Sequence, residues 1–223
     1  MNQIKRNYHE IVESLPKEVK LVAISKYHPN EHIKAVYEEG QRIFGESHVQ
    51  ELERKVRELP TDIKWHFIGH LQTNKVKYIV PYIDMIEAVD SVKLLREIEK
   101  QASKINRRIN ILLELHIAEE ATKYGFSLEE CRKMLAEGVW KTMSHVNICG
   151  LMMMASNVED EPQIRSEFSA AADFFDELKN TFFQQKEDFC ERSWGMSNDF
   201  EIACQEHSTM IRVGTRIFGE RVY

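Results

Sequence analysis

Short apolar runs rich in β-branched residues alternate with longer amphipathic stretches from one end of the chain to the other. This alternation is typical of a parallel sheet whose strands are joined by crossover helices. The candidate strands cover residues 20–25, 42–45, 64–69, 85–89, 109–116, 146–152, 191–194 and 210–213. Eight parallel strands favour closure, so we predict an α/β fold of the (β/α)8, or TIM barrel, type. One extra helix, over residues 2–14, is expected before the first strand.

Several of the stretches between the candidate strands carry helix start signals. Ser91 precedes an apolar stripe, and Ser127 with Glu130 has the spacing of a capping box. The longest helix is expected over residues 162–183, because it starts with Pro and its apolar residues recur at helical spacing. We interpret that stripe as core packing rather than as a binding face.

The composition is that of an ordinary globular protein, with 43% apolar and 30% charged residues in a chain of 223. This length and the lack of a Gly- or Ser-rich linker lead us to expect a single domain over residues 1–223. A formal charge of -6 argues against nucleic-acid binding, which needs clustered Lys and Arg. No apolar run is long enough to cross a bilayer, and the first residues lack a signal-peptide pattern. We therefore expect a cytoplasmic protein without a membrane partner.

Metal binding is not indicated by the cysteines or the histidines. The four cysteines are widely spaced and form no C-x-x-C pair, which argues against a zinc site and a disulfide framework. His66 and His70 have the spacing of two metal ligands on a helix, but residues 65–68 are an expected strand, where that spacing does not bring both rings together. His66 is interpreted as a hydrogen-bonded, half-buried histidine, whereas His70 follows the strand end and is placed to line a pocket.

Lys26 stands at the first strand end. In a parallel barrel the loops that follow the strands converge on one face, where functional residues are expected. Lys26 follows the apolar run 21–24, which places its amine at the barrel mouth. Partial desolvation there disfavours the charged form, and a neutral amine is a nucleophile toward aldehydes. A solvated lysine in a surface loop is the competing interpretation, and this residue alone does not decide between them.

The last two strand ends carry the pattern of a phosphate site. Barrels of this type commonly bind phosphate with the loops after strands seven and eight and a short helix N-terminus. Asn198 and Glu201 have capping-box spacing beside Ser197, while Gly214 and Thr215 offer backbone amides and a hydroxyl. We favour a phosphate site over the alternative that these residues only cap a helix and make a turn.

Arg212 ends the eighth strand, beside the proposed phosphate site. Its guanidinium donates hydrogen bonds and accepts none, so a buried Arg212 needs an acceptor. A pyridine nitrogen and a strand-end carboxylate both meet that need, and the residue alone leaves the two open. The three methionines 152–154 are expected to line the barrel mouth as an adaptable apolar surface.

Five segments, in this order, resemble those of the YggS/PROSC family, the pyridoxal phosphate homeostasis proteins, and the likeness covers nearly the whole chain. They are LVAISKYHP at 21–29, FGESHVQE at 44–51, WHFIGHLQTNK at 65–75, GMSND at 195–199 and IRVGTRIFG at 211–219. That family is similar to the barrel domain of alanine racemase. The resemblance therefore implies a barrel like the alanine racemase N-terminal domain.

The resemblance also implies that the chain binds pyridoxal 5'-phosphate (PLP) through residues at its strand ends. Lys26 is expected to carry the cofactor as an imine (a Schiff base), and Arg212 to face the pyridine nitrogen. The family's second motif usually ends in Asn where this chain has Ser47, so a hydroxyl replaces an amide there. The full set of expected cofactor contacts is Lys26, Ser47, His70, Met196, Ser197, Arg212, Gly214 and Thr215, of which Ser197, Gly214 and Thr215 hold the phosphate.

From this resemblance we expect a PLP carrier that takes part in intracellular vitamin B6 and amino-acid homeostasis, with no catalytic residue assigned. Racemization needs a second acid/base residue on the opposite face of the cofactor, which alanine racemase takes from another domain of a partner subunit. This chain has no length for such a domain. An Arg beside the pyridine nitrogen also disfavours its protonation and so weakens the electron sink. We expect a monomer whose partners are PLP and apo PLP-dependent enzymes.

Three alternatives remain open at this point. The chain could be a PLP-dependent amino-acid racemase or lyase of low activity that uses Lys26 as its base. It could be a barrel that binds a phosphorylated sugar without PLP. It could also be a regulatory adaptor whose partners matter more than its ligand.

Overall fold

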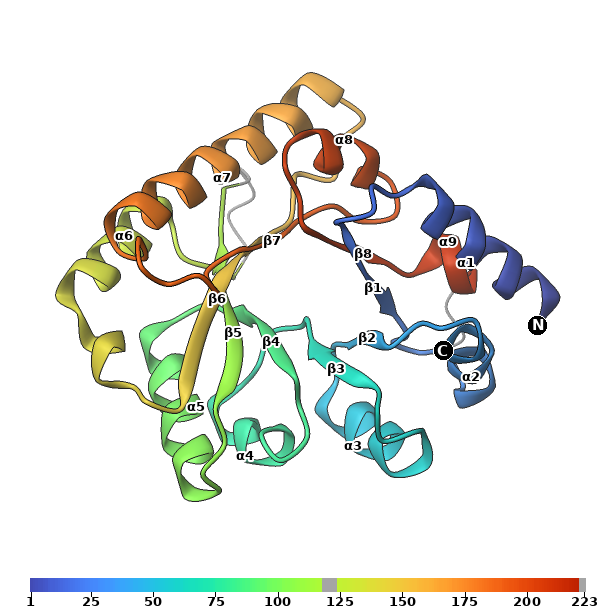
Figure 1. Cartoon of the computed structure of the whole chain (residues 1–223), viewed down its shortest axis with the longest axis horizontal. Coiled ribbons are helices and arrows are strands. Elements are labelled where there is room, and N and C mark those ends of the chain that lie inside the picture. Colours follow the sequence, from blue (N-terminus) through green and yellow to red (C-terminus); the bar gives the residue numbers. More distant parts are fainter. Residues whose placement is uncertain (118–123, 221–223) are drawn as a thin grey trace.

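The computed structural model describes residues 1–117 and 124–220, and its centre is a closed barrel of parallel strands. The strands pair in chain order, and the last pairs with the first. They are β1 Lys20–Ile24, β2 Ile43–Glu46, β3 Lys64–Phe67, β4 Met85–Val89, β5 Ile109–Leu115, β6 Val146–Met153, β7 Glu191–Ser193 and β8 Met210–Val213. Helices surround the barrel, so the (β/α)8 prediction is confirmed (Figure 1).

The helices outside the barrel are α1 Asn2–Ser14, α2 Asn30–Glu38, α3 Val49–Glu58, α4 Val76–Ile79, α5 Val92–Lys104, α6 Leu128–Glu137, α7 Glu161–Thr181, α8 Phe200–Gln205 and α9 Thr215–Phe218, with 3-10 turns η1 Thr73–Lys75 and η2 Val139–Thr142. The helices α1, α5, α6 and α7 begin within one residue of their predicted positions. Ser127 and Glu130 form the predicted capping box at α6. The apolar stripe of α7 is buried in the core, which confirms its interpretation as packing. No helix in the described part of the chain is both long and apolar enough to cross a bilayer.

The capping box predicted from Asn198 and Glu201 is wrong. Helix α8 begins after Asp199, and no side chain caps it. Oδ1 of Asp199 instead accepts the backbone N–H of Met196 at 2.5 Å. An Asp side chain often bonds its own loop in this way, and it is then withdrawn from the helix terminus. The loop after β7 is therefore braced internally.

Side chains alternate along each strand between the barrel interior and the helix layer. The interior holds a small apolar cluster that includes Val22, Ile24, Leu112, Met152 and Met210. The larger cluster lies between the strands and the helices. His66 and Arg212 also face the barrel interior, because their neighbours along the strands are apolar and face outward. Both residues are almost fully buried.

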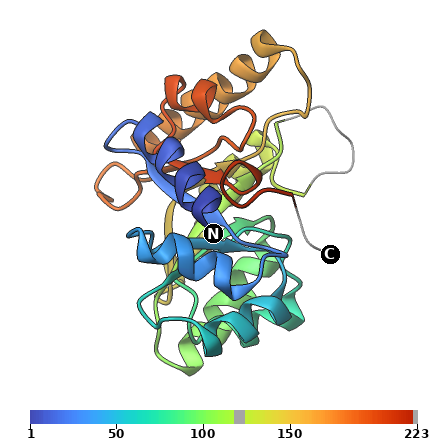
Figure 2. The ribbon, with the colours of Figure 1, turned by 90° about the vertical axis from the view of Figure 1, so that its right-hand side faces the viewer.

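The N-terminal helix α1 covers the side of the barrel where the first and last strands meet. It packs against α9 and α2, and Asn7 Nδ2 donates to the carbonyl oxygen of Ile217 at 3.1 Å. Figure 2 shows α1 crossing the face of the molecule that looks toward the viewer. The predicted extra helix thus stabilises the closure between β1 and β8.

Candidate functional site

A cavity of about 840 Å³ opens at the end of the barrel where the strands finish. Its walls are residues at the ends of β1, β3, β6, β7 and β8 and in the loops that follow them. This volume lies within the range of about 300–1,000 Å³ that small-molecule sites occupy. The position is the one at which barrels of this kind bind their ligands.

The structure brings most of the predicted site residues together at this cavity. Those in its lining are Lys26, Met196, Ser197, Arg212, Gly214 and Thr215. They come from opposite ends of the sequence, and the pairing of β1 with β8 makes them neighbours. Lys26 lies two residues after the end of β1 and is half-buried.

Ser47 and His70 are not among the residues that line the cavity. Strand β3 ends at Phe67, earlier than predicted, so the chain has already left the barrel at His70. His70 Nδ1 lies 2.8 Å from Asp90 Oδ2, and its ring stacks on Tyr124 with 3.7 Å between centroids. The Ser47 hydroxyl oxygen is buried, with no hydrogen-bond partner among the described residues.

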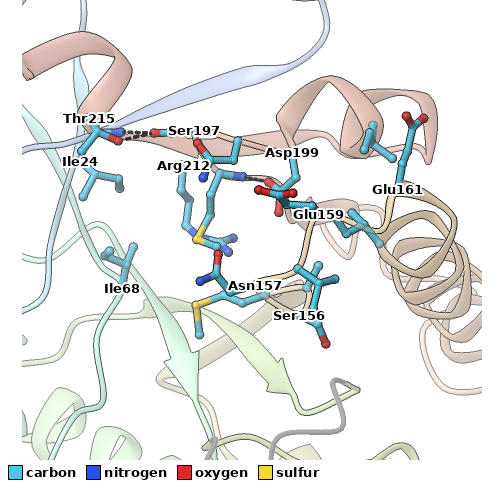
Figure 3. A pocket seen from close by; sticks show the side chains of 18 of the residues that line it. Ile24, Ile68, Ser156, Asn157, Glu159, Glu161, Ser197, Asp199, Arg212 and Thr215 are labelled. Carbon is cyan, nitrogen blue, oxygen red and sulfur yellow. Dashed lines mark hydrogen bonds between the residues drawn. The ribbon is translucent and has the colours of Figure 1, made fainter.

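Ser197, Gly214 and Thr215 form a compact cluster of polar groups in the cavity lining. Figure 3 shows Ser197 and Thr215 side by side at one end of the cavity. The hydroxyl of Thr215 donates to Ser197 Oγ at 3.0 Å, and the backbone N–H of Gly214 donates to the same oxygen at 3.4 Å. A Cβ at 214 would lie 3.2 Å from the Ile24 carbonyl oxygen and Cβ, so glycine relieves a tight approach of this loop to β1. Two hydroxyls and a backbone amide are groups that bind a phosphate oxygen well.

The opposite end of the cavity is acidic. Glu159 and Glu161 line it from the loop before α7 and from the first residue of that helix, and both lie on the far side from Thr215 in Figure 3. Asp199 also lines the cavity, but its Oδ1 is held by the N–H of Met196. Since like charges repel, an anionic group is favoured at the Ser197 end.

Arg212 is almost fully buried at the cavity base and makes several fixed contacts. Its Nη1 donates to the carbonyl oxygen and the hydroxyl of Ser193, both at 2.7 Å, and its Nη2 donates to the carbonyl oxygen of Met153 at 2.8 Å. Nη1 also lies 3.9 Å from Glu87 Oε2. Burial holds the pKa of Arg212 below its ordinary value, against the opposing effect of Glu87, Asp199 and Glu114. The sequence left open whether Arg212 faces a pyridine nitrogen or a carboxylate. In the structure a carboxylate, that of Glu87, lies beside it.

A buried ion-pair network across the barrel holds Glu87 in place beneath Arg212. His66 Nδ1 lies 2.7 Å from Glu87 Oε1, and the hydroxyl of Ser193 donates to Glu87 Oε2 at 2.6 Å. Burial lowers the pKa of His66, but Asp84 and Glu87 together raise it to about 9. Burial raises the pKa of Glu87, but His66, Arg212 and Ser193 hold it below its ordinary value. Both groups are therefore charged at neutral pH.

Glu114 is a second buried acid inside the barrel, and its Oε2 has no hydrogen-bond partner among the described residues. Burial and the nearby Asp90 raise its pKa to about 7, against the opposing effect of Arg212. Glu114 therefore keeps its proton to a higher pH than an ordinary glutamate does.

Sequence reasoning missed Glu87, Glu114 and Ser193. A signal for the two acids was available, because each follows apolar residues within a strand of a sheet expected to be buried on both faces. The methionine prediction is correct in part. Met154 lines the cavity and Met152 lies inside the barrel, but Met153 faces the helix layer.

The described residues contain no group of three or more His, Cys, Asp or Glu that could hold a metal ion. The four cysteines, all of them described, are present as free thiols.

Comparison with known proteins gives three kinds of likeness. The family model of the alanine racemase N-terminal domain matches residues 1–222. The pyridoxal phosphate homeostasis protein of Aquifex aeolicus is 36% identical over 92% of this chain and 88% of its own length. That of Pasteurella multocida is 32% identical over 99% of this chain and 96% of its own.

Solved structures agree with these sequence matches. PipY of Synechococcus elongatus with PLP bound superposes with a TM-score of 0.87 at 33% identity, over 97% of this chain and all of that one. An alanine racemase of Clostridium difficile has a TM-score of 0.74 at 12% identity, and 56% of its chain is covered. The likeness to the alanine racemase shows a shared fold.

Proposed function

We propose, because this chain belongs to the alanine racemase N-terminal domain family and within it to the pyridoxal phosphate homeostasis proteins, that it binds PLP at the mouth of its barrel. One observation carries this proposal: a single cavity joins Lys26, at the end of β1, to the polar cluster of Ser197, Gly214 and Thr215 after β7 and β8. PLP has an aldehyde and a phosphate, and these two ends of the cavity match them chemically.

The donor set at the phosphate end supports this fit. Thr215 and Gly214 both donate to Ser197 Oγ, and the Ser197 hydroxyl can in turn donate its own hydrogen to an anionic oxygen. The absence of a Cβ at Gly214 keeps the backbone close to Ile24, at the end of β1. The acidic end around Glu159 and Glu161 opposes binding of the phosphate in the reverse orientation.

Lys26 is the residue that we assign to covalent attachment. When bound, PLP supplies an aldehyde that captures amines reversibly. Lys26 would hold the cofactor as an imine, for which the carbonyl oxygen and two hydrogens of the amine would leave together as water. Since Arg212 donates hydrogen bonds and accepts none, it favours an unprotonated pyridine nitrogen beside it.

We further propose that the chain acts as a PLP carrier in vitamin B6 and amino-acid homeostasis, with delivery to apo PLP-dependent enzymes. An unprotonated pyridine nitrogen withdraws electrons weakly, which disfavours the carbanion chemistry of racemases and lyases. The names of the relatives also support homeostasis over turnover. The lining residues come from one barrel, so we propose a monomer as the binding unit.

The covalent assignment is tested by colour. Purified protein incubated with PLP should show a visible imine band that borohydride reduction bleaches and that Lys26→Ala abolishes. Lys34→Ala, a change of an exposed lysine on α2, is the matched control and should keep the band. A band that persists in Lys26→Ala would show that attachment occurs elsewhere.

The phosphate cluster is tested in the same preparations. Ser197→Ala and Thr215→Ala should each weaken PLP retention by about 1–3 kcal/mol, or roughly 5- to 150-fold, the range for a hydrogen bond to a charged group. Ser103→Ala, at an exposed position on α5, is the control. Unchanged retention in both cluster variants would refute this part of the proposal.

The racemase or lyase alternative has its own measurement. Exchange of the α-proton of several amino acids is followed in deuterated water with the PLP-loaded protein. Turnover near the usual enzymatic range of about 1–1,000 per second would replace the carrier proposal with an enzymatic one.

A further inference from the structure

Lys55 is a fully buried lysine on α3, outside the cavity. Its ammonium has three donors, and three acceptors surround it. Nζ lies 2.7 Å from Glu46 Oε1, 2.7 Å from Glu51 Oε1 and 2.8 Å from the carbonyl oxygen of Ser25. We call Glu46, Glu51 and Lys55 the buried clamp. Glu46 also accepts the hydroxyl of Ser25 at 2.6 Å, so the clamp is tied twice to that residue.

The clamp binds both peptide groups that flank Lys26. On one side, the Ser25 carbonyl belongs to the peptide that joins Ser25 to Lys26, and Lys55 donates to it. On the other side, the N–H of Tyr27 belongs to the peptide that joins Lys26 to Tyr27, and it donates to Glu51 Oε1 at 2.8 Å. The same carboxylate oxygen of Glu51 accepts from Lys55 and from Tyr27.

The loop held in this way has an unfavourable backbone conformation. Tyr27 has a φ of 66°, in the left-handed region that bulky residues rarely adopt. Such a conformation persists only where surrounding contacts impose it, and it concentrates at functional sites. The bond from Tyr27 to Glu51 is one of those contacts, and the tilted packing of the Tyr27 and His48 rings is another.

A buried ion pair is a poor way to gain stability, because removing charges from water costs about as much as their attraction returns. Hydrophobic residues of similar size would fill the space between β1, β2 and α3 without that cost. The cluster is therefore better explained by the geometry that it imposes than by the stability that it adds.

We infer that the buried clamp of Glu46, Glu51 and Lys55 is a positioning device that fixes the backbone on both sides of Lys26, so that its amine meets the aldehyde of a ligand whose phosphate lies at Ser197 and Thr215. This inference rests on the proposed function. Covalent capture needs the nitrogen within bonding reach of the aldehyde carbon, and a misplacement of 1 Å costs such a reaction about a hundredfold.

The test compares two ligands that differ only at the reacting group. PLP has the aldehyde, whereas pyridoxine 5'-phosphate has an alcohol there and cannot form an imine. In wild type, PLP should bind more tightly, and Lys26→Ala should remove that preference. A wild-type protein with no preference and no imine band would contradict the proposed function itself.

The positioning role is measured by the ratio of the affinity for PLP to the affinity for pyridoxine 5'-phosphate. Lys55→Met should reduce the preference for PLP by between about tenfold and a hundredfold, while the affinity for pyridoxine 5'-phosphate stays within about threefold. Arg57→Ala, an exposed change on the same helix, should leave both affinities unchanged. Equal loss of both affinities in a folded Lys55→Met protein would indicate a merely structural role and overturn the inference, as would an unchanged ratio.

A second pair of variants covers the case in which Lys55→Met does not fold. Glu51→Gln keeps an acceptor oxygen for Tyr27 and Lys55, whereas Glu51→Ala removes it. We expect the preference for PLP to survive in Glu51→Gln and to fall in Glu51→Ala. When the PLP-loaded proteins are diluted without borohydride, the imine band should disappear faster in Glu51→Ala. Identical behaviour of the two variants would overturn the inference.

Discussion

His66 and Glu87 show how single charged residues are retained inside the barrel. Each is almost fully buried, and each is stabilised in its charged form by the other. Ser193 occupies the remaining carboxylate oxygen of Glu87 and also contacts Arg212. The guanidinium at the cavity base is therefore fixed in place before any ligand arrives.

The raised pKa of His66 predicts a dependence of stability on pH. Because the folded protein binds this proton more tightly than the unfolded chain, the stabilisation is complete below about pH 6.5 and is lost as the pH rises through about 9. Its size, at about 1.4 kcal/mol per pKa unit, is roughly 3 kcal/mol. His66→Asn should be less stable than wild type at pH 6 by about that amount, and the gap should close by pH 9.5.

Urea unfolding at several pH values measures this gap. Burial also raises the pKa of Glu46 and of Glu114 to about 7, so these two acids lower the stability as the pH rises from about 4.5 to 7. The window from pH 7.5 to 9 therefore isolates His66. His9→Asn, at a half-exposed position on α1, is the control, and a gap independent of pH would contradict the prediction.

Strand β6 contains an irregularity in its pairing. It pairs with β5 along its length, and the register shifts at one point. Ile111 pairs with Ile148, but the next residue of β5, Leu112, pairs with Gly150. Such a bulge bends the strand and lets the chain turn with the barrel. At this point the backbone of β7 comes so close that a Cβ on Gly150 would lie 1.8 Å from the Glu191 carbonyl oxygen.

Gly150→Ala should therefore disrupt the pairing of β6 with β7. We expect a loss of more than about 4 kcal/mol in the free energy of unfolding, or no folded protein, because neither backbone can move without breaking the ladder. Gly138→Ala provides the matched control. Gly138 has a φ of 72° at the end of α6, but a Cβ there meets no atom closer than 3.7 Å, so the cost should be about 1 kcal/mol. Circular dichroism and urea titration distinguish the two variants.

At the scale of the whole molecule, the proposed ligand connects the two ends of the chain. Lys26 follows the first strand, and Gly214 and Thr215 follow the last, while α1 and α9 cover the seam between them. A bound molecule that contacts both ends resists opening of the barrel at this seam. Binding to the folded state alone stabilises it by mass action.

PLP should accordingly raise the melting temperature. At 100 times its dissociation constant the gain is about 2.7 kcal/mol, which corresponds to roughly 5–10 °C for a chain of this size. Differential scanning calorimetry checks this shift. Lys26→Ala at the same PLP concentration should show a smaller one, and an equal shift in both proteins would mean that Lys26 adds nothing to binding.

Local patterns in the sequence were sufficient to predict the eight strands, the helix before them and the strand-end positions of Lys26, Ser197, Gly214 and Thr215. The reason is that hydrophobic periodicity and strand order are properties of neighbouring residues, and closure of a parallel barrel then brings the strand ends together. His70 was misplaced relative to the cavity, because the prediction depended on where β3 ends, and strand ends are the least certain part of such patterns.

The polar contacts inside the barrel and beside it were decided only by the tertiary structure. The bond from Ser193 to Glu87 joins strands 106 residues apart, and Lys55 reaches Ser25 from a separate helix. No periodic pattern encodes such pairs, since each depends on the register and stagger of strands that meet only when the barrel closes. The sequence by itself determined the barrel and the residues at its mouth, and the closed barrel decided which buried charges hold them in position.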